Sequence, residues 1–169
     1  NLCKGLMQKP IIVLTGGEPL IWHENENFIN LVKKLLEDYE VHFETNGTIL
    51  INFAKYEIYK NCHFALGVKL ANSGVNEQKR INLDAILAIK NNARSSFLKF
   101  VLSYFDKSEL DEIINIKNQV DLPVWCMAIG ANRAELNENA LKTAEFAIKH
   151  GFNYSERIHI RLWSDKEGV

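Results

Sequence analysis

Short apolar runs alternate with segments of helical periodicity along most of this 169-residue chain. The apolar runs have the length of buried strands, and we predict strands at 11–14, 41–44, 64–70, 97–103, 124–129 and 157–162. The intervening segments predict helices near 25–38, 51–59, 83–89, 106–114 and 141–148. Strands joined by helical crossovers form parallel sheets with right-handed connections. The predicted class is therefore α/β, and an open doubly wound sheet and a full or partial barrel both satisfy the pattern.

Local signals sharpen several of these elements. The apolar run Ile11–Leu14 is expected to be a strand buried on both faces. Asp106 and Glu109 have the spacing of a capping box at the start of a helix. Gly151 is expected to end the helix at 141–148 in a left-handed C-cap. Residues 157–162 alternate charged and apolar side chains, as a last strand at a sheet edge does.

The composition excludes several classes of protein. The formal net charge is −1, which lacks the excess of cations that a duplex nucleic-acid binder needs. No apolar stretch reaches the roughly 18 residues of a membrane-spanning helix. Three widely spaced cysteines, Cys3, Cys62 and Cys126, suit a reducing compartment better than a disulfide framework. We therefore predict a single cytoplasmic domain over residues 1–169 that binds neither nucleic acid nor membrane.

Glycine and polar residues follow the predicted strands at their carboxyl ends, where α/β proteins bind ligands. The four segments are T-G-G-E-P at 15–19, E-T-N-G at 44–47, Lys69 with A-N-S-G at 71–74, and M-A-I-G at 127–130. Because carboxyl ends of parallel strands share one edge, these segments are expected to converge. The five histidines show no zinc-type spacing, so no metal site is predicted in this chain.

The first of these loops has the chemistry of a ligand site. Gly16 and Gly17 lack a Cβ atom, so a ligand can lie against their backbone. Glu18 offers a carboxylate to a cation such as an ammonium group, and Lys69 offers a positive charge to a carboxylate or phosphate. Together they suit a zwitterionic ligand with an amino-acid end. Each feature taken singly also has a structural interpretation, since Gly-Gly and Asn46-Gly47 are common turn pairs.

The order of these segments resembles a known family. T-G-G-E-P-L after a strand resembles the loop of the radical S-adenosylmethionine (SAM) superfamily that binds the amino group of SAM. E-T-N-G-T at 44–48, V-K-L-A-N-S-G at 68–74, F-L-K-F-V at 97–101 and G-F-N-Y-S-E-R-I-H-I at 151–160, followed by W-S-D-K-E-G-V, resemble the 7-carboxy-7-deazaguanine synthases of the queuosine pathway. The resemblance covers nearly all of the chain. It implies a partial (β/α) barrel of parallel strands with helical crossovers, often found as a homodimer.

The resemblance also implies roles for individual residues. Thr15 and the carboxylate of Val169 are expected to contact a pterin substrate. The SAM site is expected to comprise Gly16, Gly17, Glu18, Asn46, Gly67, Val68, Lys69, Met127, Ala128, Ile129 and Gly130.

The implied reaction converts 6-carboxy-5,6,7,8-tetrahydropterin to 7-carboxy-7-deazaguanine with loss of ammonia. In the family a [4Fe-4S] cluster reduces SAM, Mg²⁺ assists, and a reductant such as flavodoxin supplies electrons. The cluster needs three cysteine thiolates before the glycine loop, and only Cys3 precedes Thr15. We therefore expect the chain to be the C-terminal part of the barrel, without the first strand unit and inactive alone. Cluster and Mg²⁺ are expected only in the full-length protein.

Two alternatives remain open from the sequence. An activating enzyme for a glycyl-radical enzyme or an anaerobic ribonucleotide reductase also carries G-G-E-P, with a protein as its substrate. A cluster-free, non-catalytic SAM-binding module would likewise use the glycine loop. The segment R-I-H-I-x-L-W favours the synthase.

Overall fold

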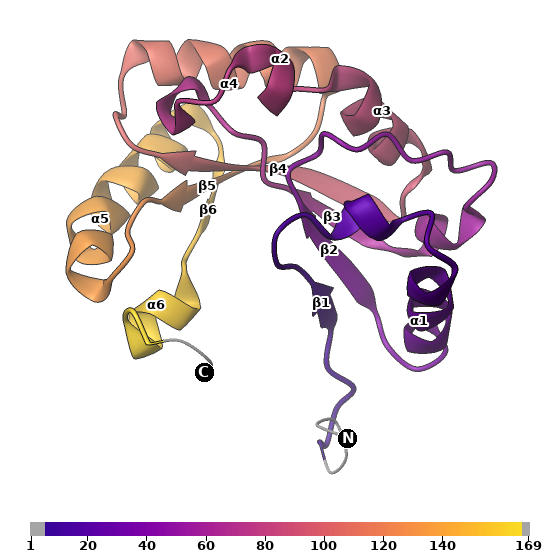
Figure 1. The fold of residues 1–169 in the computed structure, drawn as a ribbon. Coiled ribbons are helices and arrows are strands. Elements are labelled where there is room, and N and C mark those ends of the chain that lie inside the picture. The colour runs from indigo at the N-terminus through magenta and orange to yellow at the C-terminus, as the bar shows by residue number, and fades with distance from the viewer. Residues whose placement is uncertain (1–5, 167–169) are drawn as a thin grey trace. The chain divides into compact units, whose positions relative to one another are not determined.

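The computed structural model describes residues 6–166, and these form two compact units. The first unit comprises residues 6–66 and 81–96, and the second comprises residues 67–80 and 97–166. Six parallel strands with helical crossovers confirm the predicted α/β class (Figure 1). No helix within residues 6–166 combines the length and the apolar character needed to cross a membrane.

Helices and strands mostly alternate along the chain. The first unit contains β1 Ile12–Leu14, α1 Glu26–Leu36, β2 Val41–Thr45, β3 His63–Leu66 and α3 Leu83–Asn92. The second contains α2 Glu77–Arg80, most of β4 Ser95–Leu102, α4 Lys107–Val120, β5 Val124–Ala128, α5 Arg133–His150, β6 Asn153–Ser155 and α6 Ile158–Trp163. Short 3₁₀ helices lie at Pro19–Trp22, Glu57–Asn61 and Ala71–Ser73.

In the first unit, β1, β2 and β3 pair in parallel, with Leu14 opposite Phe43 and Phe43 opposite Phe64. The ring of Phe43 stacks on that of Phe64 at a centroid distance of 5.2 Å, and both side chains are fully buried. α1 begins where Asn25 accepts a hydrogen bond from the backbone N–H of Phe28. Parallel pairing puts the carboxyl ends of these strands at one edge, where the loops after β1 and β2 meet.

In the second unit, β5 lies between β4 and β6, with Met127 opposite Val101 and Ser155. Alternate residues of β4 and β5 are buried, so one face of these strands packs against helices. α4 begins at Asp106, whose carboxylate accepts the Glu109 N–H as predicted. α5 ends at Gly151, whose φ of 68° confirms the predicted left-handed cap.

Two of the predicted strands differ in the structure. β1 is not buried on both faces, because the side chain of Val13 is 49% exposed on a face that the described residues leave open. The third strand ends at Leu66 rather than Leu70. Residues 67–70 lie outside any strand, and the chain turns after Leu70, whose carbonyl accepts hydrogen bonds from the N–H and hydroxyl of Ser73.

The predicted last strand at 157–162 is wrong, because these residues form helix α6. Helical bonds join Arg161 N–H to the Arg157 carbonyl at 3.0 Å and Ser164 N–H to the Ile160 carbonyl at 2.8 Å. Only Ile160 of the apolar residues in this stretch is buried. It packs in a cluster with Ala128 and Leu136, so the alternation that suggested a strand does not mark a buried face.

The predicted helix at 51–59 is also wrong in most of its length. Asn52 accepts hydrogen bonds from the N–H groups of Ala54 and Lys55 through its side-chain oxygen. Such local side-chain bonds compete with helix formation. A 3₁₀ helix forms only at Glu57–Asn61.

Candidate functional site

The loop after β1 is an open glycine turn. Gly16 and Gly17 have φ values of 94° and 56°, which favour glycine over residues with a Cβ atom. A Cβ atom built on either glycine would meet no described atom within 4 Å. The space beside this backbone is therefore accessible to a ligand.

Glu18, the next residue, is held at the carboxyl end of β2. Its Oε1 accepts hydrogen bonds from the hydroxyl of Thr45 at 2.7 Å and from the N–H of Leu20 at 3.0 Å. Its Oε2 accepts the N–H of Asn46 at 2.7 Å. The structure thus brings Glu18 and Asn46 together, and it fixes the carboxylate between the ends of two neighbouring strands.

This arrangement leaves Glu18 able to bind a cation. A carboxylate has about four acceptor positions, and the three hydrogen bonds to Glu18 use most of them. The remaining position is on Oε2, and Glu18 directly follows the open glycine turn in the chain. A preorganised carboxylate of this kind suits an ammonium group, because charge-assisted hydrogen bonds are stronger than neutral ones.

Asn46 and Thr15 have local partners. The side-chain oxygen of Asn46 accepts the N–H and the hydroxyl of Thr48, so it closes a turn. Its backbone N–H is the group that positions Glu18. The exposed hydroxyl of Thr15 donates to Glu44 at 3.4 Å.

Gly67, Val68 and Lys69 belong to the second unit. Val68 is buried, with 2% of its surface exposed, whereas Lys69 is exposed. The buried guanidinium of Arg80 donates to the carbonyl of Lys69 at 2.8 Å and forms an ion pair with Glu112. This pair holds the segment that carries Lys69.

Met127, Ala128, Ile129 and Gly130 end β5 and begin the following loop. Ala128 is fully buried and Ile129 is 40% exposed. A Cβ atom at Gly130 would lie 2.8 Å from the backbone nitrogen of Leu136, so a glycine is required for α5 to pack this closely. Close packing of α5 therefore explains the glycine at position 130 without any role in ligand binding.

Three residues important for the strand ends were absent from the predicted site: Thr45, Arg80 and Glu109. Glu109 is 4% exposed and accepts bonds from Asn72 and from the N–H groups of residues 103–105. The capping-box spacing identified Glu109 as a helix-start residue but not its role in holding this loop. Thr45 lies in the quoted E-T-N-G segment, whereas no sequence signal pointed to Arg80.

The described residues do not fit a [4Fe-4S] cluster, which requires several cysteine thiolates close together. Cys62 and Cys126 lie in different units and are fully buried. Burial raises the pKa of each thiol to about 12, so both stay protonated at neutral pH. Cys3 and the predicted substrate residue Val169 lie outside the described residues.

Comparison with known proteins finds one family model and several relatives that share a name. A family model described as a 4Fe-4S single cluster domain matches residues 4–89. A 7-carboxy-7-deazaguanine synthase of Halobacterium salinarum is 29% identical over 91% of this chain and 65% of its own length. The synthase of Rickettsia prowazekii is 28% identical over 88% of this chain and 57% of its length. The chain thus spans 57 to 65% of these two relatives.

Proteins with other names also match this chain. A GTP 3',8-cyclase of Clostridium perfringens is 30% identical over 71% of this chain and 41% of its own length. Among solved structures, Streptococcus suis SuiB matches with a TM-score of 0.56 and 12% identity, over 86% of this chain and 38% of SuiB. A second SuiB structure, bound to S-adenosylmethionine, matches with the same TM-score. At this identity the likeness establishes a shared fold.

Proposed function

Because the chain belongs to the 4Fe-4S single cluster domain family, a radical SAM-type family, we propose that it is the SAM-binding part of a 7-carboxy-7-deazaguanine synthase. The proposed reaction of the full-length protein converts 6-carboxy-5,6,7,8-tetrahydropterin to 7-carboxy-7-deazaguanine with loss of ammonia. The names of several relatives, which match most of this chain, support this substrate class.

One observation carries the proposal. The carboxylate of Glu18 is fixed by Thr45 and Asn46 and lies next to the open backbone of Gly16 and Gly17. We propose that this carboxylate binds the amino group of the methionine part of SAM. A preorganised carboxylate beside accessible backbone is suited to bind an ammonium group.

The remaining residues of the proposed site bind and orient. In the second unit, Gly67, Val68, Lys69 and the segment Met127–Gly130 are assigned to further SAM contacts. Thr15 and Val169 are assigned to the pterin. Bound SAM supplies radical chemistry when it is reduced, and the described residues contribute its binding rather than its reduction. The [4Fe-4S] cluster, Mg²⁺, a flavodoxin-type reductant and a homodimer belong to the proposal for the full-length protein.

The binding part of the proposal is tested on the 169-residue chain with SAM by isothermal titration calorimetry. Replacing Glu18 with Gln removes the negative charge but keeps the size, and it should weaken SAM binding by roughly 1.5–3 kcal/mol. Glu37→Gln is the matched control, since Glu37 is exposed at the end of α1, and it should leave the affinity unchanged. Equal affinities of the chain and its Glu18→Gln variant would remove Glu18 from the site.

The reaction is tested on the full-length protein, reconstituted with iron and sulfide and supplied with SAM, Mg²⁺ and a reductant. The carboxypterin should yield 7-carboxy-7-deazaguanine. GTP forms a second arm, because the match to GTP 3',8-cyclases favours that reaction as the next candidate. SAM cleavage only with a protein substrate would indicate an activating enzyme. SAM binding without cleavage in any arm would indicate a non-catalytic module.

A further inference from the structure

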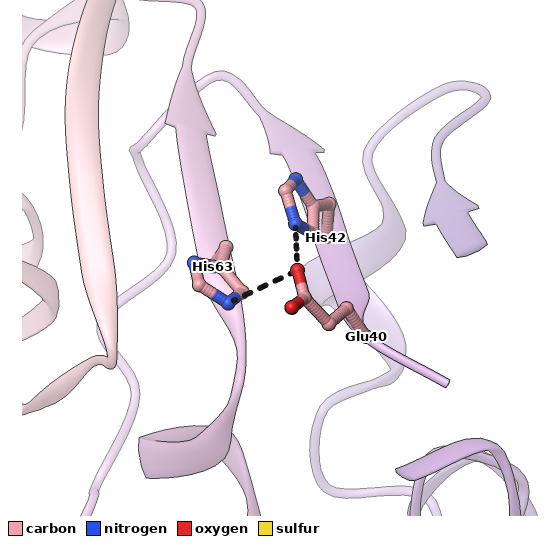
Figure 2. A group of neighbouring side chains, drawn as sticks. All are labelled: Glu40, His42 and His63. Atoms are coloured by element: carbon pink, nitrogen blue, oxygen red, sulfur yellow. Dashed lines mark ion pairs between the residues drawn. The ribbon is translucent and has the colours of Figure 1, made fainter. Parts of the chain in front are cut away.

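Three metal-ligating side chains converge at the amino ends of β2 and β3 (Figure 2). Glu40 directly precedes β2, His42 is its second residue, and His63 is the first residue of β3. The strand register places His42 opposite His63, and side chains two residues apart on a strand share a face. One ligand atom from each residue lies within 4.8 Å of the others.

The Nε2 atoms of the two histidines in this cluster lack hydrogen-bond partners within the described residues. The Nε2 atoms of His42 and His63 are buried, and neither has a hydrogen bond within the described residues. Glu40 Oε2 lies 3.5 Å from the first and 3.9 Å from the second, and such distances are too long for a hydrogen bond. A buried polar atom without a partner is uncommon and calls for an unseen ligand or water.

The spacing fits a bound metal ion. Four-coordinate Zn²⁺ has bonds of about 2.0–2.1 Å to nitrogen and oxygen, so neighbouring ligand atoms lie about 3.4 Å apart. The distance from Glu40 Oε2 to His42 Nε2, 3.5 Å, is close to this value. The distance to His63 Nε2, 3.9 Å, is about 0.5 Å longer, so the His63 side chain must move slightly inward when the ion binds. We infer that Glu40, His42 and His63 bind a divalent transition-metal ion of the Zn²⁺ type.

A neighbouring hydroxyl supports this assignment. Nδ1 of His63 lies 2.6 Å from Oγ of Ser95. When Nδ1 donates its proton to Ser95, the lone pair of Nε2 is left for a metal, as in many metal-bound histidines.

This site is separate from the proposed SAM loop. Glu40 precedes the first residue of β2, whereas Thr45 is the last residue of that strand and contacts Glu18. Two histidines and one carboxylate leave a fourth coordination position for water or a small ligand. The side chain of Glu40 is 53% exposed, so the ion can enter from solvent.

The test uses the metal-free 169-residue chain without a histidine tag and ZnCl₂ as the only added metal. Titration against a chromophoric chelator should give one saturable Zn²⁺ per chain. His42→Gln and His63→Gln should each weaken binding by more than the roughly 10–100-fold that loss of an outer-shell partner causes. His159→Gln is the matched control, because His159 is exposed on α6, and it should bind like the unaltered chain.

Two further variants keep the result unambiguous. Cys3→Ser should still bind one Zn²⁺, and Co²⁺ bound in place of Zn²⁺ should show no thiolate absorption. If circular dichroism shows that the histidine variants do not fold, the Zn²⁺ affinity of Glu40→Gln tests the inference instead. The exposed side chain of Glu40 contributes little to folding, so this variant should fold. The inference is overturned if the chain binds no saturable Zn²⁺, or if Glu40→Gln and folded histidine variants bind it with unchanged affinity.

Discussion

A glutamate lies at each end of β2, Glu18 from the loop after β1 and Glu40 just before β2, and the two have opposite environments. At the carboxyl end, Glu18 accepts three hydrogen bonds, two of them from Thr45 and Asn46. At the amino end, Glu40 lies beside two buried imidazole nitrogens that have no hydrogen-bond partner within residues 6–166. The first end is organised before any ligand arrives, whereas the second becomes satisfied only when a ligand binds. The same strand can therefore hold a preorganised site and a ligand-dependent one.

The largest expected contrast is between Glu18→Ala and Glu40→Ala in the ligand-free chain. Removing the Glu18 carboxylate leaves the hydroxyl of Thr45 and two backbone N–H groups unpaired, and it should lower the free energy of unfolding by about 3 kcal/mol. Glu40→Ala should change it by less than about 0.5 kcal/mol, as surface substitutions usually do. Urea denaturation of both variants measures the difference. Equal losses would contradict the preorganisation of the carboxyl end.

Thr45→Val isolates one contact of the organised end. The hydroxyl of Thr45 donates to Glu18 at 2.7 Å and accepts the N–H of Gly47 at 3.2 Å, and the residue is 4% exposed. Valine keeps the shape but removes both bonds, so the free energy of unfolding should fall by about 2 kcal/mol. Thr45→Ser should restore most of this loss. If the serine variant is as unstable as the valine variant, packing rather than hydrogen bonding explains the role of Thr45.

The amino end of β3 also holds a buried thiol, which gives the fold a pH dependence. Burial raises the pKa of Cys62 from its usual value of 9.0 to about 12. Between these values the folded thiol keeps a proton that the unfolded thiol loses. The free energy of unfolding should therefore fall as pH rises above 9, by about 1.4 kcal/mol per pH unit for this thiol.

Urea denaturation at a series of pH values measures this slope. The pKa of Cys126 is raised by a similar amount, and the pKa of Tyr59 is also raised. The slope measured for the unaltered chain is therefore the sum of contributions from several groups. Cys62→Ala removes one of them and should reduce the slope between about pH 9 and 10 by the share of one thiol. An unchanged slope would mean that Cys62 ionises in the folded protein as easily as in the unfolded one.

Sequence patterns predicted the elements whose local signals agree with their tertiary environment. β2 and α1 formed as predicted, because apolar periodicity and Asn25 favour the same boundaries. α5 ends where Gly151 predicted, but it begins at Arg133, well before the predicted start at 141. The segment 157–162 failed because its alternation suits a strand, while its backbone forms helical bonds and buries Ile160. Local pattern cannot reveal which of several apolar residues will meet a partner far away in the chain.

The candidate sites show the same limit. Glu18 was found because its loop motif is local, and Thr45 was quoted with its strand end. Arg80 binds the carbonyl of Lys69 and the carboxylate of Glu112. No spacing in the sequence predicts either contact. His42 and His63 lack any zinc-type spacing, since only the register of β2 with β3 brings them together.

The smallest expected effect concerns Arg94, whose positive charge acts on His63 at the amino end and helps to lower its pKa. The same charge opposes a bound cation, so Arg94→Gln should tighten Zn²⁺ binding. Because Arg94 is exposed, the gain should be only about 0.2–1 kcal/mol, and added salt should reduce it. Arg94→Lys keeps the charge and should match the unaltered chain in competition titrations. Weaker Zn²⁺ binding by Arg94→Gln would contradict a purely electrostatic effect of Arg94 on the cluster at the amino end of β2.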